Sequence, residues 1–460
     1  MLIPSHELIH RFDASAPCYT TYPTTDRFVQ AFASEQLVQA LAQRRSGVAA
    51  LRVPLSIYVH IPFCESLCYF CACHKIVTRQ HAHGETYLHY LGRELDLYTA
   101  HLGTGQTVSQ LHLGGGSPTF LSDVELHQLM AMLRQSFRFS ADGDHCIEVD
   151  PRTVDSVRLA TLAELGFNRL SFGVQDFDPA VQQAVHRIQP AEQVFSMMSA
   201  ARVVGFESIN MDLICGLPQQ TPQSFDRTLA QLVQLRPDCI ALYAYDHLPQ
   251  RFKPQRRIDV AALPDANARI CMQMHAFSAF QAAGYVHIGM EQFALPSHAL
   301  AIAKRQGRLH RDLQGYNSQP DADLIGLGVC AIGKLGASYS QNAKTLDAYY
   351  DNLQQGRLPV ARGLALSRDD LVRRSVIMAL VCQGQLDFES IELGYLIDFK
   401  RYFSAELEML GGLQAQGLVE VSDTGLQVTA TGSYFVCSVA MVFDRYLQAD
   451  RTRAKFSRII

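Results

Sequence analysis

The chain has 460 residues, of which 48% are hydrophobic and 18% are charged, and its formal net charge is −4. This composition is typical of a globular protein with a large core, and it excludes a disordered chain or a coiled coil. Because no overall positive charge is available, nucleic acid is not an expected partner. The chain also lacks an apolar core of signal-peptide length and any apolar run near the roughly 18 residues of a membrane span. We therefore expect a cytoplasmic protein without a membrane partner, and we take it to be a monomer.

The chain begins with an arm, residues 1–52, that precedes the first predicted strand. Its most distinctive stretch is Tyr19-Thr20-Thr21-Tyr22-Pro23-Thr24. Judged by residue type alone, this stretch packs on the main domain and uses Tyr19 and Tyr22 as aromatic anchors.

Strands and helices alternate from Leu55 onward. Runs of β-branched and aromatic residues predict strands at Ser56–Ile61, Gln110–Leu113, His145–Val149, Arg169–Val174, Ser208–Ile214, Cys239–Tyr245 and Val286–Gly289. Repeated βα units predict a parallel sheet, and six such units before Val286 predict an α/β fold, an incomplete TIM-like (β/α)6 barrel over residues 53–362. Functional side chains should then lie at the carboxyl ends of the strands.

The regular alternation of predicted strands and helices ends after Gly363. The patterns predict helices over Ser367–Val381 and Phe399–Leu413, and a hairpin of residues 418–421 and 426–429 around Asp423-Thr424-Gly425. Residues 363–460 are therefore expected to form a smaller, mostly helical C-terminal domain.

Four of the twelve cysteines lie in one loop, Cys64-Glu65-Ser66-Leu67-Cys68-Tyr69-Phe70-Cys71-Ala72-Cys73, directly after the first strand. Three cysteines within eight residues can wrap one compact iron-sulfur cluster, and three ligands on a four-iron cube leave one iron open for a small chelating molecule. A zinc site would crowd four ligands into one loop, and a disulfide framework is not typical of a long chain without a secretory signal. The eight other cysteines are interpreted as small buried apolar residues.

Polar residues follow several of the predicted strands. Gly114-Gly115-Gly116-Ser117-Pro118-Thr119 suits either a close approach of backbone to a ligand or an ordinary tight turn. Strand alternation directs Glu148 into the barrel, where a carboxylate needs a partner, and Asp150 before Pro151 is interpreted as a helix N-cap.

The same alternation places Asn210 and Asp212 on the inner face of a later strand. Gln175 ends the strand before it, and Arg187 follows soon after. Each of these residues could instead be a satisfied polar group of the core.

The CxxxCxFC spacing behind Tyr58-Val59-His60-Ile61-Pro62-Phe63 resembles the signature of radical S-adenosylmethionine (radical SAM) enzymes. The added Cys73, the following Lys75-Ile76-Val77-Thr78-Arg79 and the Tyr19–Thr24 stretch narrow the resemblance to the oxygen-independent coproporphyrinogen III oxidases. The similarity extends from about Arg11 to the closing Phe456-Ser457-Arg458-Ile459-Ile460, almost the whole chain.

The resemblance implies the cofactors and the residues that hold them. One 4Fe-4S cluster is held by Cys64, Cys68 and Cys71, and two SAM molecules are expected in each active site. The first SAM molecule is expected at Tyr58, Phe70, Gly115, Gly116, Ser117, Glu148 and Ile332, and the second at Gln175, Arg187 and Asp212. The catalytic candidates are Glu148, Tyr22 and Cys73. Tyr22 is included because the family's N-terminal arm lies near the active site, and the role of Cys73 stays open.

The implied reaction begins when one electron from the reduced cluster cleaves SAM to methionine and a 5′-deoxyadenosyl radical. The radical takes a hydrogen atom from the β-carbon of a propionate, and loss of carbon dioxide and one electron leaves a vinyl group. Two rounds convert coproporphyrinogen III to protoporphyrinogen IX in haem biosynthesis, with an unidentified reductant such as flavodoxin or ferredoxin.

Three other functions compete with this interpretation: a haem-binding chaperone of the same superfamily, an anaerobic haem-degrading radical enzyme and a plain iron-sulfur electron carrier. The fourth cysteine and the Tyr-Thr-Thr-Tyr-Pro arm favour the oxidase over the chaperone. The chain departs from the family pattern at Asp246, Gln292 and Lys334. Asp246 is also a candidate for cofactor binding. The first two departures keep the haem-degrading enzyme in consideration, and a plain carrier would not need a barrel with a polar interior.

Overall fold

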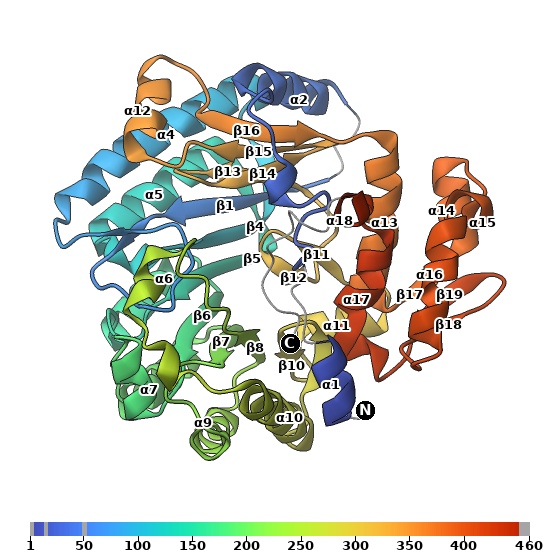
Figure 1. The fold of residues 1–460 in the computed structure, drawn as a ribbon. Coiled ribbons are helices and arrows are strands. Elements are labelled where there is room, and N and C mark those ends of the chain that lie inside the picture. Colours follow the sequence, from blue (N-terminus) through green and yellow to red (C-terminus); the bar gives the residue numbers. More distant parts are fainter. Residues whose placement is uncertain (1–3, 13–16, 48–52, 450–460) are drawn as a thin grey trace.

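The structure of the protein is a computed structural model that describes residues 4–12, 17–47 and 53–449. A sheet of 12 strands forms its centre, in the order β16-β15-β14-β13-β1-β4-β5-β6-β7-β8-β10-β9 (Figure 1). None of the helices within the described ranges is long and apolar enough to cross a membrane.

Six consecutive parallel strands make the barrel wall: β1 (Leu55–Ile61), β4 (Gln106–Gly115), β5 (Phe137–Val149), β6 (Arg169–Gln175), β7 (Ser208–Cys215) and β8 (Cys239–Ala244). Their inward and outward alternation follows the predicted pattern, with Ile147 and Val149 buried on the helix side of β5. The predicted α/β class and the incomplete (β/α)6 barrel are therefore confirmed.

Further strands extend both edges of the sheet. On one side β13 (Asp323–Leu327) lies parallel to β1, and β14 (Ile332–Leu335), β15 (Ser338–Asn342) and β16 (Val360–Ala365) follow antiparallel. On the other side β10 (Gln292–Ala294) and β9 (Val286–Gly289) are antiparallel. Val286–Gly289 is thus a strand, as predicted, but it belongs to a hairpin at the sheet edge and not to a further βα unit.

Helices cover the outside of the barrel: α4 (Ala82–Leu102), α5 (Asp123–Ser136), α6 (Ser156–Glu164), α7 (Pro179–Ala184), α8 (Ala191–Val204), α9 (Pro222–Leu235) and α10 (Ala266–Ala282). Ser122 and Glu125 form a capping box at the start of α5, and Thr221 caps α9, which has proline in its first turn. The other elements before residue 360 are α2 (Ser34–Ser46) in the N-terminal arm, β2 (Phe63–Cys64), β3 (Ile76–Val77), α11 (Ala299–Arg305), β11 (His310–Asp312), β12 (Gly315–Asn317) and α12 (Leu346–Gln354).

The C-terminal segment packs α13 (Arg368–Gln383), α14 (Phe388–Tyr395), α15 (Phe399–Tyr402), α16 (Ser404–Gln414), α17 (Val436–Ala440) and α18 (Arg445–Ala449) around a small sheet of β17 (Gln385–Asp387), β19 (Gly425–Val428) and β18 (Val419–Val421). The predicted hairpin is confirmed. The helix predicted over Phe399–Leu413 is wrong as a single element, because the chain leaves helical geometry at Phe403.

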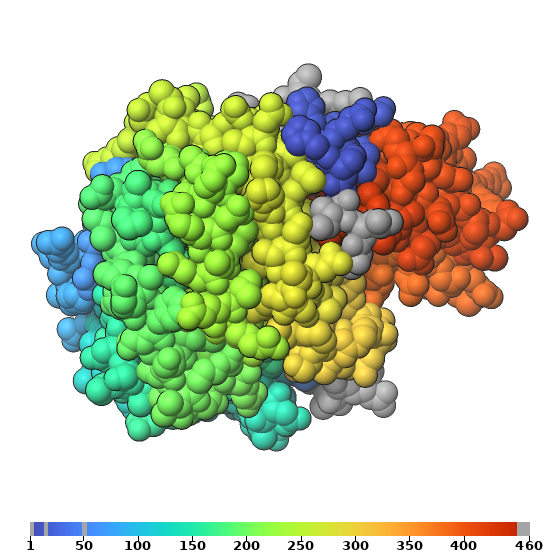
Figure 2. All heavy atoms as spheres, turned by 90° about the horizontal axis from the view of Figure 1, so that it is seen from below, coloured from blue at the N-terminus to red at the C-terminus, as the bar shows by residue number. Residues whose placement is uncertain are grey.

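The N-terminal arm joins the barrel to the C-terminal segment. Figure 2 shows α1 (His6–Phe12), in blue, at the boundary between barrel and C-terminal atoms, and the ring of Phe12 lies 5.2 Å from that of Phe435. Tyr19 and Tyr22 are buried, and Tyr19 Oη donates to Asp444 Oδ2 at 3.2 Å. The aromatic anchors predicted from residue type are therefore present. The boundaries 1–52, 53–362 and 363–460 stay predictions, and the last strand of the large sheet ends at Ala365.

Candidate active site

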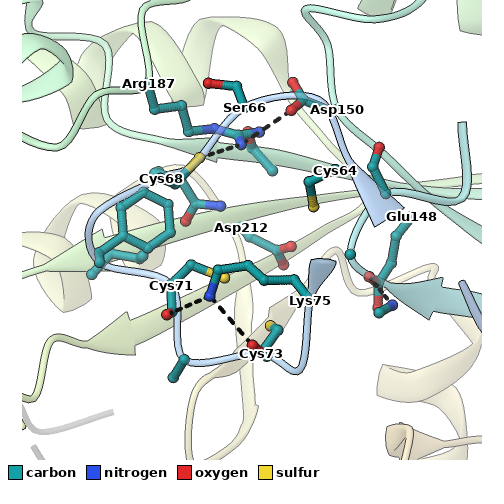
Figure 3. A pocket seen from close by; sticks show the side chains of 18 of the residues that line it. Cys64, Ser66, Cys68, Cys71, Cys73, Lys75, Glu148, Asp150, Arg187 and Asp212 are labelled. Atoms are coloured by element: carbon teal, nitrogen blue, oxygen red, sulfur yellow. Dashed lines mark hydrogen bonds and ion pairs between the residues drawn. The ribbon is translucent and has the colours of Figure 1, made fainter. Parts of the chain in front are cut away.

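A cavity of about 740 Å³ opens at the carboxyl ends of the parallel strands, where the fold class places functional side chains (Figure 3). Most residues singled out from the sequence line it: Cys64, Cys68, Phe70, Cys71, Cys73, Gly115, Gly116, Ser117, Glu148, Gln175, Arg187, Asp212 and Asp246. The barrel thus brings residues 64–246 together around one space.

The Cys68 thiol lies between two guanidinium groups. Arg187 Nη1 donates to Cys68 Sγ at 3.5 Å, and Arg152 Nη2 donates to it at 3.6 Å. Both arginines also contact Asp150, at 3.3 and 2.6 Å from its Oδ2. Two positively charged groups therefore donate to the sulfur that the sequence predicts as a cluster ligand.

Lys75 fixes the other end of the cysteine loop. Its Nζ donates to the carbonyl oxygens of Cys71 at 2.9 Å and Cys73 at 3.3 Å. A hydrogen bond from the Cys73 thiol, together with the charge of Lys75, outweighs burial and lowers the pKa of Cys71 to about 6. Burial and the neighbouring Cys71 and Cys68 thiols raise the pKa of Cys64 to about 12. Of these two thiols in one loop, Cys71 therefore ionises more readily than an ordinary cysteine and Cys64 less readily.

Among the described residues, these thiols are not gathered around a position for one metal ion. Within the described parts of the chain, no three His, Cys, Asp or Glu side chains are placed to hold a single metal ion. A tetrahedral zinc site needs its sulfurs about 2.3 Å from one centre. The thiols of Cys64, Cys68 and Cys71 instead point into the cavity from separate positions of one loop, as Figure 3 shows. Three thiols with two guanidinium groups nearby form a donor set that fits a 4Fe-4S cluster.

The glycine motif brings backbone close to the cysteine loop. Gly115 has φ +116°, and a Cβ on Gly116 would lie 2.7 Å from the carbonyl oxygens of Pro62 and Phe63. Side chains are therefore excluded at both positions. The Gly115 N–H donates to Glu148 Oε2 at 3.2 Å, which joins the motif to the end of β5.

Glu148 has a partner that the sequence analysis missed. His112 Nε2 lies 3.0 Å from Glu148 Oε1. Burial alone would lower the pKa of His112, but the nearby Cys146 thiol and the Glu148 carboxylate raise it well above its ordinary value. The Glu148 carboxylate therefore favours the protonated form of the His112 ring. His112 sits on β4 in register with Cys146, two residues before Glu148 on β5, and the sequence alone does not give that register.

The interpretation of Asp150 as a helix N-cap is wrong. Helix α6 begins at Ser156, and Asp155 caps it. Asp150 pairs with Arg187 and Arg152, which overcome the effect of burial and lower its pKa to about 2. The carboxylate therefore orients the two arginines that flank Cys68.

Asp212 lies deeper, where the main cavity meets a smaller one of about 210 Å³ in the barrel interior. Asn210 donates to its Oδ1 at 2.8 Å and Ser171 to its Oδ2 at 3.3 Å. Burial and the nearby Glu148 carboxylate raise the pKa of Asp212 to about 7. Gln292, one of the departures, donates to Asn210 Oδ1 at 3.2 Å and so belongs to the same network.

Comparisons with known proteins identify the family. Residues 58–232 match the model of the radical SAM superfamily, and residues 366–435 match the HemN C-terminal domain. Oxygen-independent coproporphyrinogen III oxidases of Pseudomonas aeruginosa and Escherichia coli are each 44% identical to the chain, over 99% and 98% of it and 98% of their own lengths. The chain belongs to the oxygen-independent coproporphyrinogen III oxidase family.

The structural comparison agrees. The solved structure of coproporphyrinogen III oxidase (HemN) from Escherichia coli, a radical SAM enzyme, superimposes with a TM-score of 0.91 and 42% identity, covering 97% of this chain and all of that one. As a radical SAM protein, this family member uses a 4Fe-4S cluster and SAM.

Three predicted site residues of this family member do not line the main cavity. Tyr58 Oη lies 3.1 Å from His60 Nδ1, and its ring stacks on His112, one step behind Glu148. Ile332 begins β14 beside Gly326. Tyr22 packs against the C-terminal segment, its ring 6.2 Å from that of Tyr446. Their roles, like those of the cavity residues, stay predictions.

Proposed function

We propose that this chain catalyses the oxygen-independent oxidative decarboxylation of two propionate side chains of coproporphyrinogen III to vinyl groups, giving protoporphyrinogen IX. The main support is one observation: three cysteines converge on a cavity at the carboxyl ends of the barrel strands, in a chain that matches relatives of this name over 98% or more of its length.

Within that cavity, we assign Cys64, Cys68 and Cys71 to a 4Fe-4S cluster. When bound there, the cluster and SAM supply a one-electron bond cleavage that generates a species able to remove a hydrogen atom from carbon. Gly115, Gly116 and Ser117 form a backbone cradle of the kind that accepts the methionine part of SAM. Gln175, Arg187 and Asp212 are assigned to the second SAM molecule.

The protein itself positions groups and excludes water. The Glu148 carboxylate, paired with His112, offers a fixed negative group for a ribose or an ammonium. Phe70, Tyr243 and Tyr245 contribute aromatic surface to the cavity wall. A shielded, oriented site is needed because a carbon radical reacts with any nearby hydrogen donor.

We further propose the partners and location of the protein. The one-electron donor is a small reductant of the flavodoxin or ferredoxin class, and the protein acts as a cytoplasmic monomer. All twelve cysteines are free thiols, which suits a reducing compartment.

The test is anaerobic incubation of the reconstituted protein with SAM, a reductant and coproporphyrinogen III. We expect 5′-deoxyadenosine and a divinyl product, both measured by chromatography with mass detection. An intact cluster without vinyl product would reject the assignment. Tight haem binding without turnover would instead indicate a chaperone, and opening of the haem ring would indicate a degrading enzyme.

A further inference from the structure

A second group of reactive side chains lies outside the barrel, on the pair of helices α9 and α10. Cys271 Sγ lies 3.4 Å from His275 Nε2, one helical turn further along α10. The other ring nitrogen, His275 Nδ1, lies 2.8 Å from Asp226 Oδ1 on α9. Thiol, imidazole and carboxylate thus form a continuous relay across two packed helices.

The relay has the order that activates a nucleophile. Asp226 accepts the Nδ1 proton and leaves Nε2 free to accept the proton of the thiol. A single metal ion does not explain the group, because the histidine directs opposite nitrogens toward its two partners. The Cys271, His275 and Asp226 side chains also have no part in the cavity at the barrel mouth.

The surroundings leave this thiol accessible. The His275 and Asp226 side chains are 42% and 50% exposed, and Cys271 is partly exposed. Asp226 also borders an apolar hollow of about 370 Å³ between the two helices, lined by Leu229, Ala230, Val233, Ala279, Ala282 and Ala283. A small uncharged molecule can therefore approach the relay from solvent.

We propose that Cys271 is an activated thiol at which small uncharged electrophiles, hydrogen peroxide among them, modify the protein covalently. The thiol proton passes to His275 Nε2 and the sulfur attacks one peroxide oxygen. The O–O bond breaks, and the departing hydroxide takes the proton from His275 to become water. Sulfur is oxidised to a sulfenic acid and peroxide is reduced.

The test measures alkylation of the anaerobic holoenzyme by iodoacetamide at about pH 7, followed by mass spectrometry of the Cys271 peptide. An ordinary exposed cysteine is only about 3% thiolate at this pH. We expect the Cys271 rate to fall about tenfold in His275→Gln and about threefold in Asp226→Asn. His127→Gln, which removes an exposed histidine from α5, is the matched control and should leave the rate unchanged.

Two further measurements make the result decisive. Cys215 and Cys437 are buried, so alkylation of their peptides would reveal unfolding of a variant. The rate of SAM cleavage by each variant should equal that of the unmodified protein. With peroxide in place of iodoacetamide, a dimedone adduct should form at Cys271 and decrease in His275→Gln. Equal rates in His275→Gln and the unmodified protein, or an equal loss in His127→Gln, would overturn the proposal.

Discussion

The cysteine loop holds three thiols that are proposed as cluster ligands and a fourth, Cys73, that is not. Cys68 lies between Arg152 and Arg187, whereas the Cys73 thiol hydrogen-bonds to Cys71. The two cysteines share one loop and one cavity, so they form a matched pair for substitution.

We expect Cys68→Ala to abolish the visible absorbance of the reconstituted cluster, because two thiolates cannot replace three as ligands. Cys73→Ala should retain that absorbance. Spectroscopy and iron content, measured anaerobically on both variants, check this result. An unchanged spectrum in Cys68→Ala, or an equal loss in Cys73→Ala, would refute the ligand set.

The guanidinium of Arg152 offers a second test at the same sulfur. Net charge and hydrogen bonds to sulfur set the reduction potential of an iron-sulfur cluster. Arg152→Gln removes a positive charge 3.6 Å from Cys68 Sγ, which makes the added electron less favourable. We expect the potential to fall by roughly 50–100 mV in a potentiometric titration. Arg138→Gln, an exposed arginine on β5, is the control and should leave the potential within error.

At the scale of elements, a buried carboxyl fastens α4 to the strands that extend the barrel. Glu94 is fully buried and accepts from the Gly328 N–H at 2.8 Å, Asn342 Nδ2 at 2.7 Å and Tyr349 Oη at 2.6 Å. It therefore holds the turn between β13 and β14, which leads to Ile332. Burial outweighs these hydrogen bonds and raises its pKa from 4.5 to about 7.

This shift predicts how stability depends on pH. Between about pH 4.5 and 7 the folded state holds a proton that the unfolded state has released, so the contribution of Glu94 to stability falls as pH rises and is lowest above pH 7. Glu94→Gln cannot ionise, so its urea midpoint should change less than that of the unmodified protein between these pH values. Identical pH profiles for the two proteins would show that the pKa of Glu94 does not differ between the folded and unfolded states.

Sequence patterns predict elements and alternation well, because both depend on neighbouring residues. The two-residue alternation of side chains along β5 places Glu148 inside the barrel. The close spacing of four cysteines identifies the loop of residues 64–73 as a candidate site. The role of Asp150 was missed because its partner Arg187 is 37 positions away, and a proline after it suggested a local cap. His112 was missed because the two inward-facing residues belong to different strands whose register only the folded sheet shows.

At the scale of the whole molecule, one buried arginine connects the arm, the sheet edge and the C-terminal segment. Arg311 donates to Glu291 Oε1 at 2.9 Å, Glu291 Oε2 at 3.2 Å and the carbonyl oxygen of Cys18 at 3.1 Å. Its guanidinium also lies 4.5 Å from the ring centre of Tyr316, whose hydroxyl donates to the Val381 carbonyl on α13. These contacts span residues 18–381 and hold the arm that precedes the barrel against its far edge.

The cost of removing Arg311 should depend on whether Glu291 remains charged. Arg311→Met removes the cation paired with Glu291, a carboxylate with 18% exposure, and the loss of one partner of a buried pair costs about 3–5 kcal/mol. The double variant Arg311→Met with Glu291→Gln removes both charges, so we expect it to be more stable than Arg311→Met alone. Urea unfolding of the two single variants and the double variant measures this coupling. If the losses of the single variants simply add, the pair contributes nothing to joining the arm and the sheet edge. If the double variant regains stability, the coupled charge pair holds the arm, and Tyr22 with it, in place between barrel and C-terminal segment.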